Sequence, residues 1–358
     1  MKIGLIGLPN SGKTTIFNAL TGLDAEISSY STQKTEPNLG IVKVIDERIS
    51  KLAEFYEPKK IIHATIEYID FAGLPRVAGK ESLSNSLLTL AKTTDALAAV
   101  VRNFKDEIID QTLGKPDPLA DIEIINTELI LSDLIIAEKR LEKIELSLKR
   151  GVKNNELMIE EKAVRKAIES LNKDIPLRNI DFPSDEEKSI RGFQFLSQKP
   201  MMIILNSDEK NLGHNSELQE KIRSNYKVME FAGNFEMELS KLMHEEQQDF
   251  MADMNIKESA RDRLTKLSYE LLGYISFFTI GKDEVRAWTI VNGENAVDAA
   301  GKVHSDLARG FIRAECFSYE DLIRLGSEKA LREKGLFRLE GKNYIVKDGD
   351  VLKIRFSI

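Results

Sequence analysis

The sequence is poor in the residues that build disulfide and zinc sites. It has one cysteine in 358 residues, Cys316, which excludes a disulfide framework within the chain and fits a reducing compartment. Its four histidines are scattered, and none has a neighbour at a zinc-binding spacing. We therefore expect a cytoplasmic protein that folds without disulfides or structural zinc.

Long apolar runs are also missing. No run approaches the roughly 20 residues that a membrane span needs. The amino terminus lacks the basic flank, apolar core and small-residue cleavage site of a signal peptide. Hydrophobic residues make up 42% and charged residues 30%, as in soluble globular proteins. We expect no membrane association, and the length predicts two or three domains.

An excess of positive charge is absent from the chain as a whole. The net charge of −7 argues against a protein that coats nucleic acid nonspecifically. The charge is uneven, because residues 274–358 hold 14 basic and 13 acidic side chains and the remainder holds 37 and 45. The carboxyl-terminal part could therefore approach RNA, with a solvated mixed-charge surface as the alternative. Its candidate RNA-facing side chains are Arg286, Lys302, Arg309, Arg313 and Lys347. Its large aromatic residues are expected in the core rather than as base-stacking platforms: Phe277, Phe278, Trp288 and Phe311.

Short apolar runs alternate with helical patterns over residues 1–118 and 178–255. This alternation predicts an α/β domain with a mostly parallel, helix-covered sheet. The expected strands are 2–7, 38–45, 64–70, 95–101, 201–205 and 228–231, with a helix over 13–22.

Residues 119–177 interrupt this alternation with two long helical runs. Apolar positions three and four apart cover 121–150 and 155–172, and Gly151 separates the runs. We expect an inserted antiparallel helical hairpin, with a packed helical layer as the alternative. Residues 256–273 predict a linking helix. Residues 274–358 predict a separate α+β unit, because short strands and turns end in an Asp-Gly turn at 348–349.

A phosphate-binding loop is the clearest motif. Residues 7–14 fit the pattern G-x-x-x-x-G-K-[ST] between the first strand and the first helix. Glycines let the backbone N–H groups turn toward phosphate oxygens, and the helix directs its positive end to the same place. Lys13 should reach the β- and γ-phosphates and act in catalysis, and the Thr14 hydroxyl should ligate Mg²⁺. The candidate nucleotide contacts in this loop are Asn10, Ser11, Gly12, Lys13, Thr14 and Thr15.

A second phosphate-sensing motif follows the third strand. Asp70 and Gly73 form the pattern D-x-x-G. The Asp70 carboxylate can hold Mg²⁺, and the Gly73 N–H can meet the γ-phosphate and move when it leaves. Gly73 is therefore the second catalytic candidate.

The strand ending at residue 205 leads into a candidate base-binding loop. Guanine-specific G proteins carry N-K-x-D there, and this chain has Asn206, Ser207 and Glu209 at the corresponding positions. The longer Glu209 carboxylate should not make the bidentate guanine contact. Asp208 could replace it only if the loop shifts. The candidate set also includes Phe231, Ala232 and Gly233 after the next strand.

Together these residues resemble the Obg-like ATPase, or YchF, subfamily of P-loop GTPases, with a carboxyl-terminal TGS domain. The resemblance covers essentially the whole chain, in the blocks 7–14, 36–38, 70–74, 121–123, 125–129, 285–289, 300–304, 310–314 and 344–350. It implies a G-domain-like P-loop fold with a helical arm and a ubiquitin-like β-grasp unit. It also implies a base motif N-x-x-E that accepts ATP at least as well as GTP. Ribosome binding, with the large subunit as the expected partner, and a role in translation or stress responses follow from the same resemblance.

Three departures from the family pattern concern switching and hydrolysis. Lys34 stands where the family has threonine, the stretch 79–85 has lost glycines, and Ala99 stands where many members have a histidine. As in the family, Leu74 replaces the glutamine that orients water in most translation GTPases.

Three functions follow from these observations. The first is a monomeric switch that hydrolyses ATP slowly and needs a partner or a monovalent cation for faster hydrolysis. Asn10 occupies the position of a K⁺ ligand in some related G proteins. The second is a nucleotide-dependent ribosome- or RNA-binding module that does not hydrolyse, which acts through the TGS unit and the arm. The third, a metabolic kinase, is disfavoured because no Arg-rich lid segment is evident.

Overall fold

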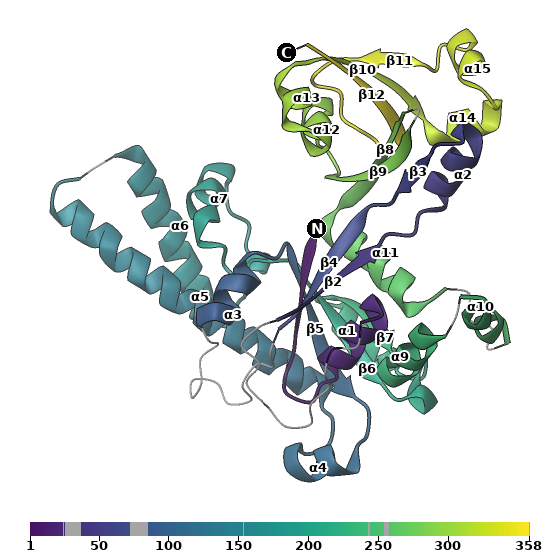
Figure 1. The fold of residues 1–358 in the computed structure, drawn as a ribbon. Helices are drawn as coiled ribbons and strands as arrows, with labels where there is room; N and C mark the ends of the chain where they lie inside the picture. The colour runs from purple at the N-terminus through teal and green to yellow at the C-terminus, as the bar shows by residue number, and fades with distance from the viewer. Residues whose placement is uncertain are drawn as a thin grey trace. The chain divides into compact units, whose positions relative to one another are not determined.

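The computed structural model describes residues 1–23, 25, 37–71, 85–152, 154–242, 244–253, 258–281 and 283–357. The chain divides into two units, each made of separate stretches of sequence (Figure 1). The first unit comprises 1–41 and 67–261, and the second comprises 42–66 and 262–358.

A six-stranded sheet forms the centre of the first unit. Its strand order is β2-β4-β1-β5-β6-β7. β1 pairs in parallel with β4 and β5, and β6 pairs in parallel with β5 and β7, so the predicted mostly parallel sheet is confirmed. The strands are β1 (Lys2–Ile6), β2 (Asn38–Lys43), β4 (Thr65–Asp70), β5 (Ala96–Asn103), β6 (Met201–Ser207) and β7 (Lys227–Phe231).

Helices cover this sheet and extend from it. The helices and short 3-10 turns of this unit are α1 (Lys13–Thr21), α3 (Asn85–Lys92), α4 (Glu107–Leu113), α5 (Pro118–Lys149), α6 (Asn155–Leu171), η1 (Leu177–Asn179), α7 (Ser184–Ile190), η2 (Arg191–Phe193), η3 (Glu209–Asn211), α8 (Ser216–Arg223), α9 (Gly233–Lys241) and α10 (His244–Asp253). β6 is buried along its whole length, as is typical of a parallel strand covered on both faces. None of the described helices is long and apolar enough to cross a membrane.

α5 and α6 form the predicted helical hairpin, which we call the arm (Figure 1). The first turns of α5 pack on the sheet through Ile122, Ile125 and Leu129. Beyond them, α5 joins a second apolar cluster with α6, which includes Ile144 and Val164. The base of the arm is therefore a packed layer on the sheet, and its remainder is a hairpin with its own core.

The second unit is an α+β fold around a mixed sheet, as predicted. The strand order is β11-β10-β12-β8-β9-β3. Its elements are α2 (Glu47–Tyr56), β3 (Lys60–Ile62), α11 (Ala260–Leu272), β8 (Tyr274–Ile280), β9 (Glu284–Val291), α12 (Ala296–Val303), α13 (Ser305–Arg309), β10 (Phe311–Ser318), α14 (Tyr319–Leu325), α15 (Glu328–Glu333), β11 (Arg338–Glu340) and β12 (Asp350–Phe356). Phe277, Phe278 and Phe311 are buried, so the prediction that they lie in the core is confirmed. Trp288 is partly exposed and stacks on Phe277.

Residues 42–66 correct the predicted domain organisation. The sequence placed them in the nucleotide-binding range 1–118, but they pack with the carboxyl-terminal residues. β3 adds to the sheet edge by parallel pairing with β9, in the register Lys60↔Glu284. Arg48 on α2 donates to Asp348 Oδ2 at 2.7 Å. Strand pairing and this ion pair hold the segment in the second unit.

Candidate functional site

The loop between β1 and α1 has a backbone that only glycine allows at two positions. Gly12 adopts φ +88°, and a Cβ built on it would lie 2.1 Å from Asn206 Nδ2. A Cβ on Gly7 would lie 2.5 Å from Val100 O and 2.8 Å from Ser11 Oγ. Such distances are impossible for real side chains. The loop is therefore packed tightly against its surroundings on the side where each Cβ would stand.

The amino terminus of α1 has no counter-charge from its own helix. Gly12 is the N-cap residue and supplies no side-chain hydrogen bond, and no acidic side chain lies in the first turn. In contrast, Asp46 caps α2 and Asp106 caps α4. Because the first N–H groups of a helix lack partners within it and carry partial positive charge, this end is suited to an anion.

Lys13 lies over this loop rather than pointing into solvent. Lys13 is 8% exposed, and its Cδ lies 3.3 Å from where a Cβ of Gly7 would be. Burial lowers the pKa of the Lys13 ammonium, and the Asp70 carboxylate partly opposes that shift. A buried ammonium beside an uncapped helix end is a site that favours a polyanion.

The two predicted metal ligands come together at the ends of neighbouring elements. Thr14 Oγ1 donates to Asp70 Oδ2 at 2.9 Å. Asn38 Nδ2 donates to the same oxygen at 3.2 Å. Within the described residues, Asp70 Oδ1 and Ser11 Oγ are buried without a hydrogen-bond partner. A hydroxyl and a carboxylate with an unused oxygen are a donor set that fits Mg²⁺.

Asn206 connects the phosphate loop to the loop after β7. Its Nδ2 donates to Ser11 O at 3.0 Å, and its Oδ1 accepts from Gly233 N at 3.1 Å. Asn206 is 4% exposed, so both ends of its amide are used in the interior. It therefore fixes the spacing of three segments that are far apart in the sequence.

The other candidate base-binding residues after β6 have different surroundings. Ser207 is buried and donates to Glu230 Oε1 at 2.6 Å. Asp208 Oδ2 accepts from Lys105 N at 3.1 Å and from Asn211 Nδ2 at 3.4 Å. Glu209 is exposed at the start of η3. Turning Asp208 toward a guanine would break two hydrogen bonds.

Some of the remaining predicted residues are described by the structure, and others are not. Thr15 is buried on α1, and Phe231, Ala232 and Gly233 are buried where β7 leads into α9. Asn10 holds φ +62°, a conformation that asparagine tolerates better than most residues. Gly73, Leu74, Lys34 and the stretch 79–84 lie outside the described residues.

Comparisons with known proteins match this arrangement. The chain is 40% identical over 363 residues to "Ribosome-binding ATPase YchF" of Bacillus subtilis (strain 168), covering 99% of each protein. It is 38% identical over 362 residues to the protein of the same name in Escherichia coli O157:H7, covering 100% of this chain and 99% of that one. The chain belongs to the YchF family. The solved "Structure of the Schizosaccharomyces pombe YchF GTPase" superposes with a TM-score of 0.84 at 30% identity, covering 99% of this chain and 97% of that one.

Two family models match separate parts of this YchF-family chain. Residues 2–139 match MMR_HSR1, described as "50S ribosome-binding GTPase". Residues 274–357 match YchF-GTPase_C, described as "Protein of unknown function (DUF933)". The GTPase model matches the amino-terminal part and the YchF-specific model matches the carboxyl-terminal part, as the resemblance to the YchF subfamily implies.

Sequence reasoning missed three residues around the site of this YchF-family chain. Asn38 was assigned to a strand, but its amide contacts Asp70. Phe104 follows β5, and its ring lies 3.7 Å from where a Cβ of Gly12 would be. Glu230 is 7% exposed and accepts several hydrogen bonds from the base-binding loop. For Glu230, the signal in the sequence was an acidic residue inside the apolar strand β7, which predicts a specific partner but does not identify it.

Ala99 lies in the middle of the sheet. It pairs with Ile6 on one side and Ile203 on the other, and it is fully buried in the apolar cluster beneath the phosphate loop. Its methyl group can neither donate nor accept a proton.

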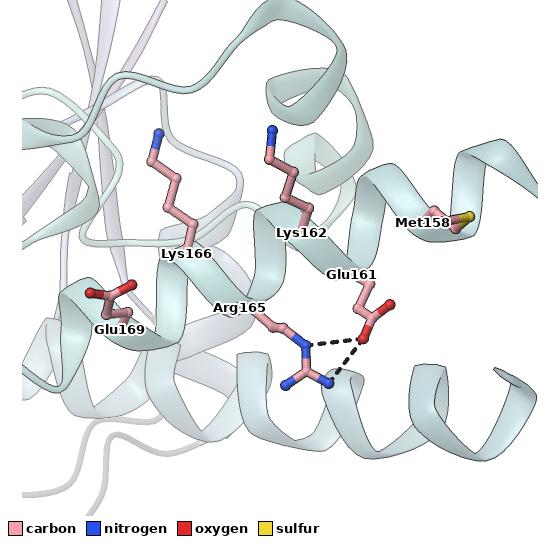
Figure 2. A pocket seen from close by; sticks show the side chains of 6 residues that line it. All are labelled: Met158, Glu161, Lys162, Arg165, Lys166 and Glu169. Atoms are coloured by element: carbon pink, nitrogen blue, oxygen red, sulfur yellow. Dashed lines mark hydrogen bonds and ion pairs between the residues drawn. The ribbon is translucent and has the colours of Figure 1, made fainter. Parts of the chain in front are cut away.

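A surface depression of about 450 Å³ lies on α6, in the arm. Figure 2 shows Lys162 and Lys166 pointing to one side of α6, while Arg165 contacts Glu161 on another. Lys162 pairs with Glu186 at 2.8 Å, and Lys166 donates to Asp181 O at 2.6 Å. The residues that line this depression are Met158, Glu161, Lys162, Arg165, Lys166 and Glu169. The basic groups are already engaged within the chain, so the depression has no evident ligand.

The basic residues proposed to face RNA differ in their surroundings. Lys302, Arg313 and Lys347 are exposed. Arg286 is half-buried and stacks its guanidinium on Trp288 at 3.9 Å, and Arg309 pairs with Asp306 at 3.1 Å. Their contact with RNA stays a prediction.

Proposed function

We propose that this chain is a ribosome-binding ATPase that binds ATP at residues 7–14 and slowly hydrolyses it to ADP and phosphate. Relatives of nearly identical length and 38–40% identity carry that name. The structural observation that carries the proposal is the Thr14–Asp70 contact of 2.9 Å beside the buried Lys13. These three side chains come from the two motifs that a P-loop nucleotidase needs in contact.

The residues of the site have distinct roles in this proposal. Backbone N–H groups of the loop and the Lys13 ammonium hold the phosphates and offset their charge as it shifts in the transition state. Thr14 and Asp70 would hold Mg²⁺, which would supply positive charge to offset that of the phosphates. Gly73 is proposed to donate its N–H to the γ-phosphate. Asn10 is the candidate for contact with K⁺.

The base-binding loop supports ATP over GTP. Guanine selection needs a short carboxylate aimed at the base, and Asp208 is held by Lys105 N and Asn211. Glu209, at the family's N-x-x-E position, is exposed and one methylene longer than aspartate. An adenine, which lacks guanine's N1–H and N2–H₂ donors, does not require that bidentate contact.

Slow hydrolysis is expected because two positions lack a side chain that could assist the reaction. Leu74 cannot orient water by hydrogen bonding, and Ala99 is an apolar residue inside the sheet. A partner would therefore have to add transition-state stabilisation. We propose the ribosome, through its large subunit, as that partner, with contacts from the second unit and the arm. The protein would act as a cytoplasmic, monomeric switch in translation or stress response.

Paired calorimetry tests occupancy and base choice together. Non-hydrolysable ATP and GTP analogues are titrated into the full chain with Mg²⁺. Tighter binding of the ATP analogue is expected. Equal binding, or preference for the GTP analogue, would overturn the assignment of ATP.

Phosphate release tests turnover. Single-turnover hydrolysis of ATP is measured with and without ribosomes, in KCl and in NaCl. Ribosome-stimulated release is expected. Binding without any release in either condition would leave the second function, a nucleotide-dependent binding module, as the correct one. Equal rates in KCl and NaCl would remove the proposed role of K⁺.

A further inference from the structure

Glu230 is a buried carboxylate with four hydrogen-bond donors. It lies one residue before the end of β7 and is 7% exposed. It accepts from Ser207 Oγ at 2.6 Å, Gly213 N at 2.9 Å and Gln219 Nε2 at 3.0 Å. It also accepts from Asn215 Nδ2. An ionised carboxylate offers about four acceptor positions, so these donors match its capacity.

All four donors come from one stretch of chain, residues 207–219. This stretch starts at the end of β6, continues through Asp208 into η3, which begins at Glu209, and enters α8. A single side chain therefore joins the beginning, the middle and the end of the loop that is expected to read the base.

Strand alternation separates this contact from the phosphate loop. Asn206 and Ser207 are consecutive in β6, so their side chains point to opposite faces of the sheet. Asn206 contacts Ser11 O, while Ser207 contacts Glu230, whose partner in the parallel register is Leu205. Glu230 consequently acts on the base-binding loop from the face opposite the phosphate loop.

Ser207 is thereby committed to the interior. Its hydroxyl donates to Glu230 and accepts from Asn103 Nδ2 at 2.9 Å. It occupies the position of the lysine in N-K-x-D, but its hydroxyl is used to hold the loop.

We infer that Glu230 is a positioning residue for base recognition. It fixes the loop of residues 207–219, which carries Glu209, and so determines the affinity for the base while leaving phosphate binding unchanged. This inference rests on the proposed function, because it assumes that a nucleoside triphosphate binds at residues 7–14.

Glu230→Gln is the sharpest variant. Glutamine keeps the shape but replaces one acceptor oxygen with an NH₂ group that faces donors, so at least one of the four bonds is lost and the loop loosens. Calorimetry measures binding of ATP, GTP and inorganic tripolyphosphate, each with Mg²⁺. ATP binding is expected to weaken about 10-fold or more, which corresponds to one or two lost hydrogen bonds. The ATP-to-GTP preference should shrink, and tripolyphosphate binding should stay within about twofold.

Two further variants keep the test decisive. Glu217→Gln is the matched control, because Glu217 lies on α8, is 88% exposed and pairs only with Lys221 on that helix among its described contacts. It should change none of the three affinities. Gln219→Ala removes one donor and should weaken ATP binding in the same direction but less, so it carries the test if Glu230→Gln does not fold.

The outcomes distinguish this inference from the proposed function. Equal weakening of ATP and tripolyphosphate would assign Glu230 a general structural role and overturn the inference. Unchanged affinity for both ATP and tripolyphosphate would overturn it as well. A wild-type chain that binds neither ATP nor tripolyphosphate would overturn the proposed function itself.

Discussion

Asp133 is a buried carboxylate outside the nucleotide site. It is fully buried on α5, where Oδ1 accepts from Leu196 N at 2.9 Å and Oδ2 from Ser197 N at 2.7 Å. Burial raises the pKa of Asp133 from its ordinary value of 3.8 to about 6, although these bonds and Lys92 oppose the shift. The carboxylate joins the base of the arm to the residues that lead into β6.

This shift predicts a pH dependence of stability. Because the folded-state pKa lies above the unfolded one, the contribution of Asp133 is fully present below about pH 4 and is lost as pH rises to 6. Relative to Asp133→Asn, the wild type should lose roughly 3 kcal/mol of unfolding free energy across that range. Urea unfolding of both proteins at pH 4, 5, 6 and 7 measures the difference. A difference that stays constant with pH would contradict the prediction.

For single residues, the sequence predicted contacts between residues that belong to recognised motifs, but not contacts made by a residue outside any motif. Thr14 and Asp70 were predicted as partners because each belongs to a motif with a known chemical requirement, and they lie 2.9 Å apart. Glu230 belongs to no motif. Its donors lie 11 to 23 residues away on a loop without regular periodicity, so their convergence depends on the packed sheet.

Among the elements, α5 has an unusual span. Its 32 residues take part in two apolar clusters, one on the sheet and one in the arm. The arm cluster also includes Ile190 and Phe195, which lie past the end of the predicted hairpin. The arm is therefore stabilised by its own core as well as by its attachment to the sheet.

Truncation of the arm core should destabilise the arm and leave nucleotide binding intact. Ile144 is 1% exposed in that cluster, so Ile144→Ala should cost about 2–4 kcal/mol through lost burial and a cavity. Hydrogen exchange should accelerate in α5 and α6, while ATP affinity stays unchanged. Leu146→Ala is the control on the same helix, since Leu146 is 52% exposed and should have little effect. Equal effects of the two variants would mean that the arm has no independent core.

Elements with strong periodicity were predictable, and short ones were not. The predicted strands and arm helices agree with β1, β2, β4 to β7, α5 and α6 to within a few residues, since apolar spacing is a local signal. β3 has three residues and two of them are exposed. Its existence depends on pairing with β9, more than 220 residues later in the chain, so no local pattern indicates it.

At the scale of the whole molecule, the second unit is not formed by the carboxyl-terminal residues alone, because it also contains residues 42–66. The segment 42–66 lies between β2 and β4 in the chain, and both strands belong to the sheet of the first unit. It also completes the second sheet through β3. The two units are therefore connected by the chain at three places.

Arg48 should be important for the stability of the second unit. It bonds both oxygens of Asp348, at 2.7 and 3.2 Å, and lies 5.3 Å from the ring of Phe278. Its side chain is only 25% exposed. Arg48→Ala should cost about 1–3 kcal/mol, because it removes two charged hydrogen bonds to Asp348 and the contact with Phe278, and it should accelerate hydrogen exchange in β8 and β9.

An exposed ion pair of the same segment gives the matched control. Lys59 lies 2.8 Å from Asp283, but the two side chains are 79% and 76% exposed. Exposed pairs contribute little to stability, so Lys59→Ala should leave exchange in β8 and β9 unchanged. If Arg48→Ala also has no effect, residues 42–66 are not held in the second unit by this contact.

The affinity of Lys13→Ala for Mg·ATP, measured by calorimetry, tests the phosphate site most directly. Lys13 is buried over the loop and is the charged group expected to reach the β- and γ-phosphates. Loss of its charged hydrogen bonds should weaken binding roughly 100-fold or more, while the variant stays folded by circular dichroism. Unchanged affinity in a folded variant would mean that the triphosphate does not bind at residues 7–14.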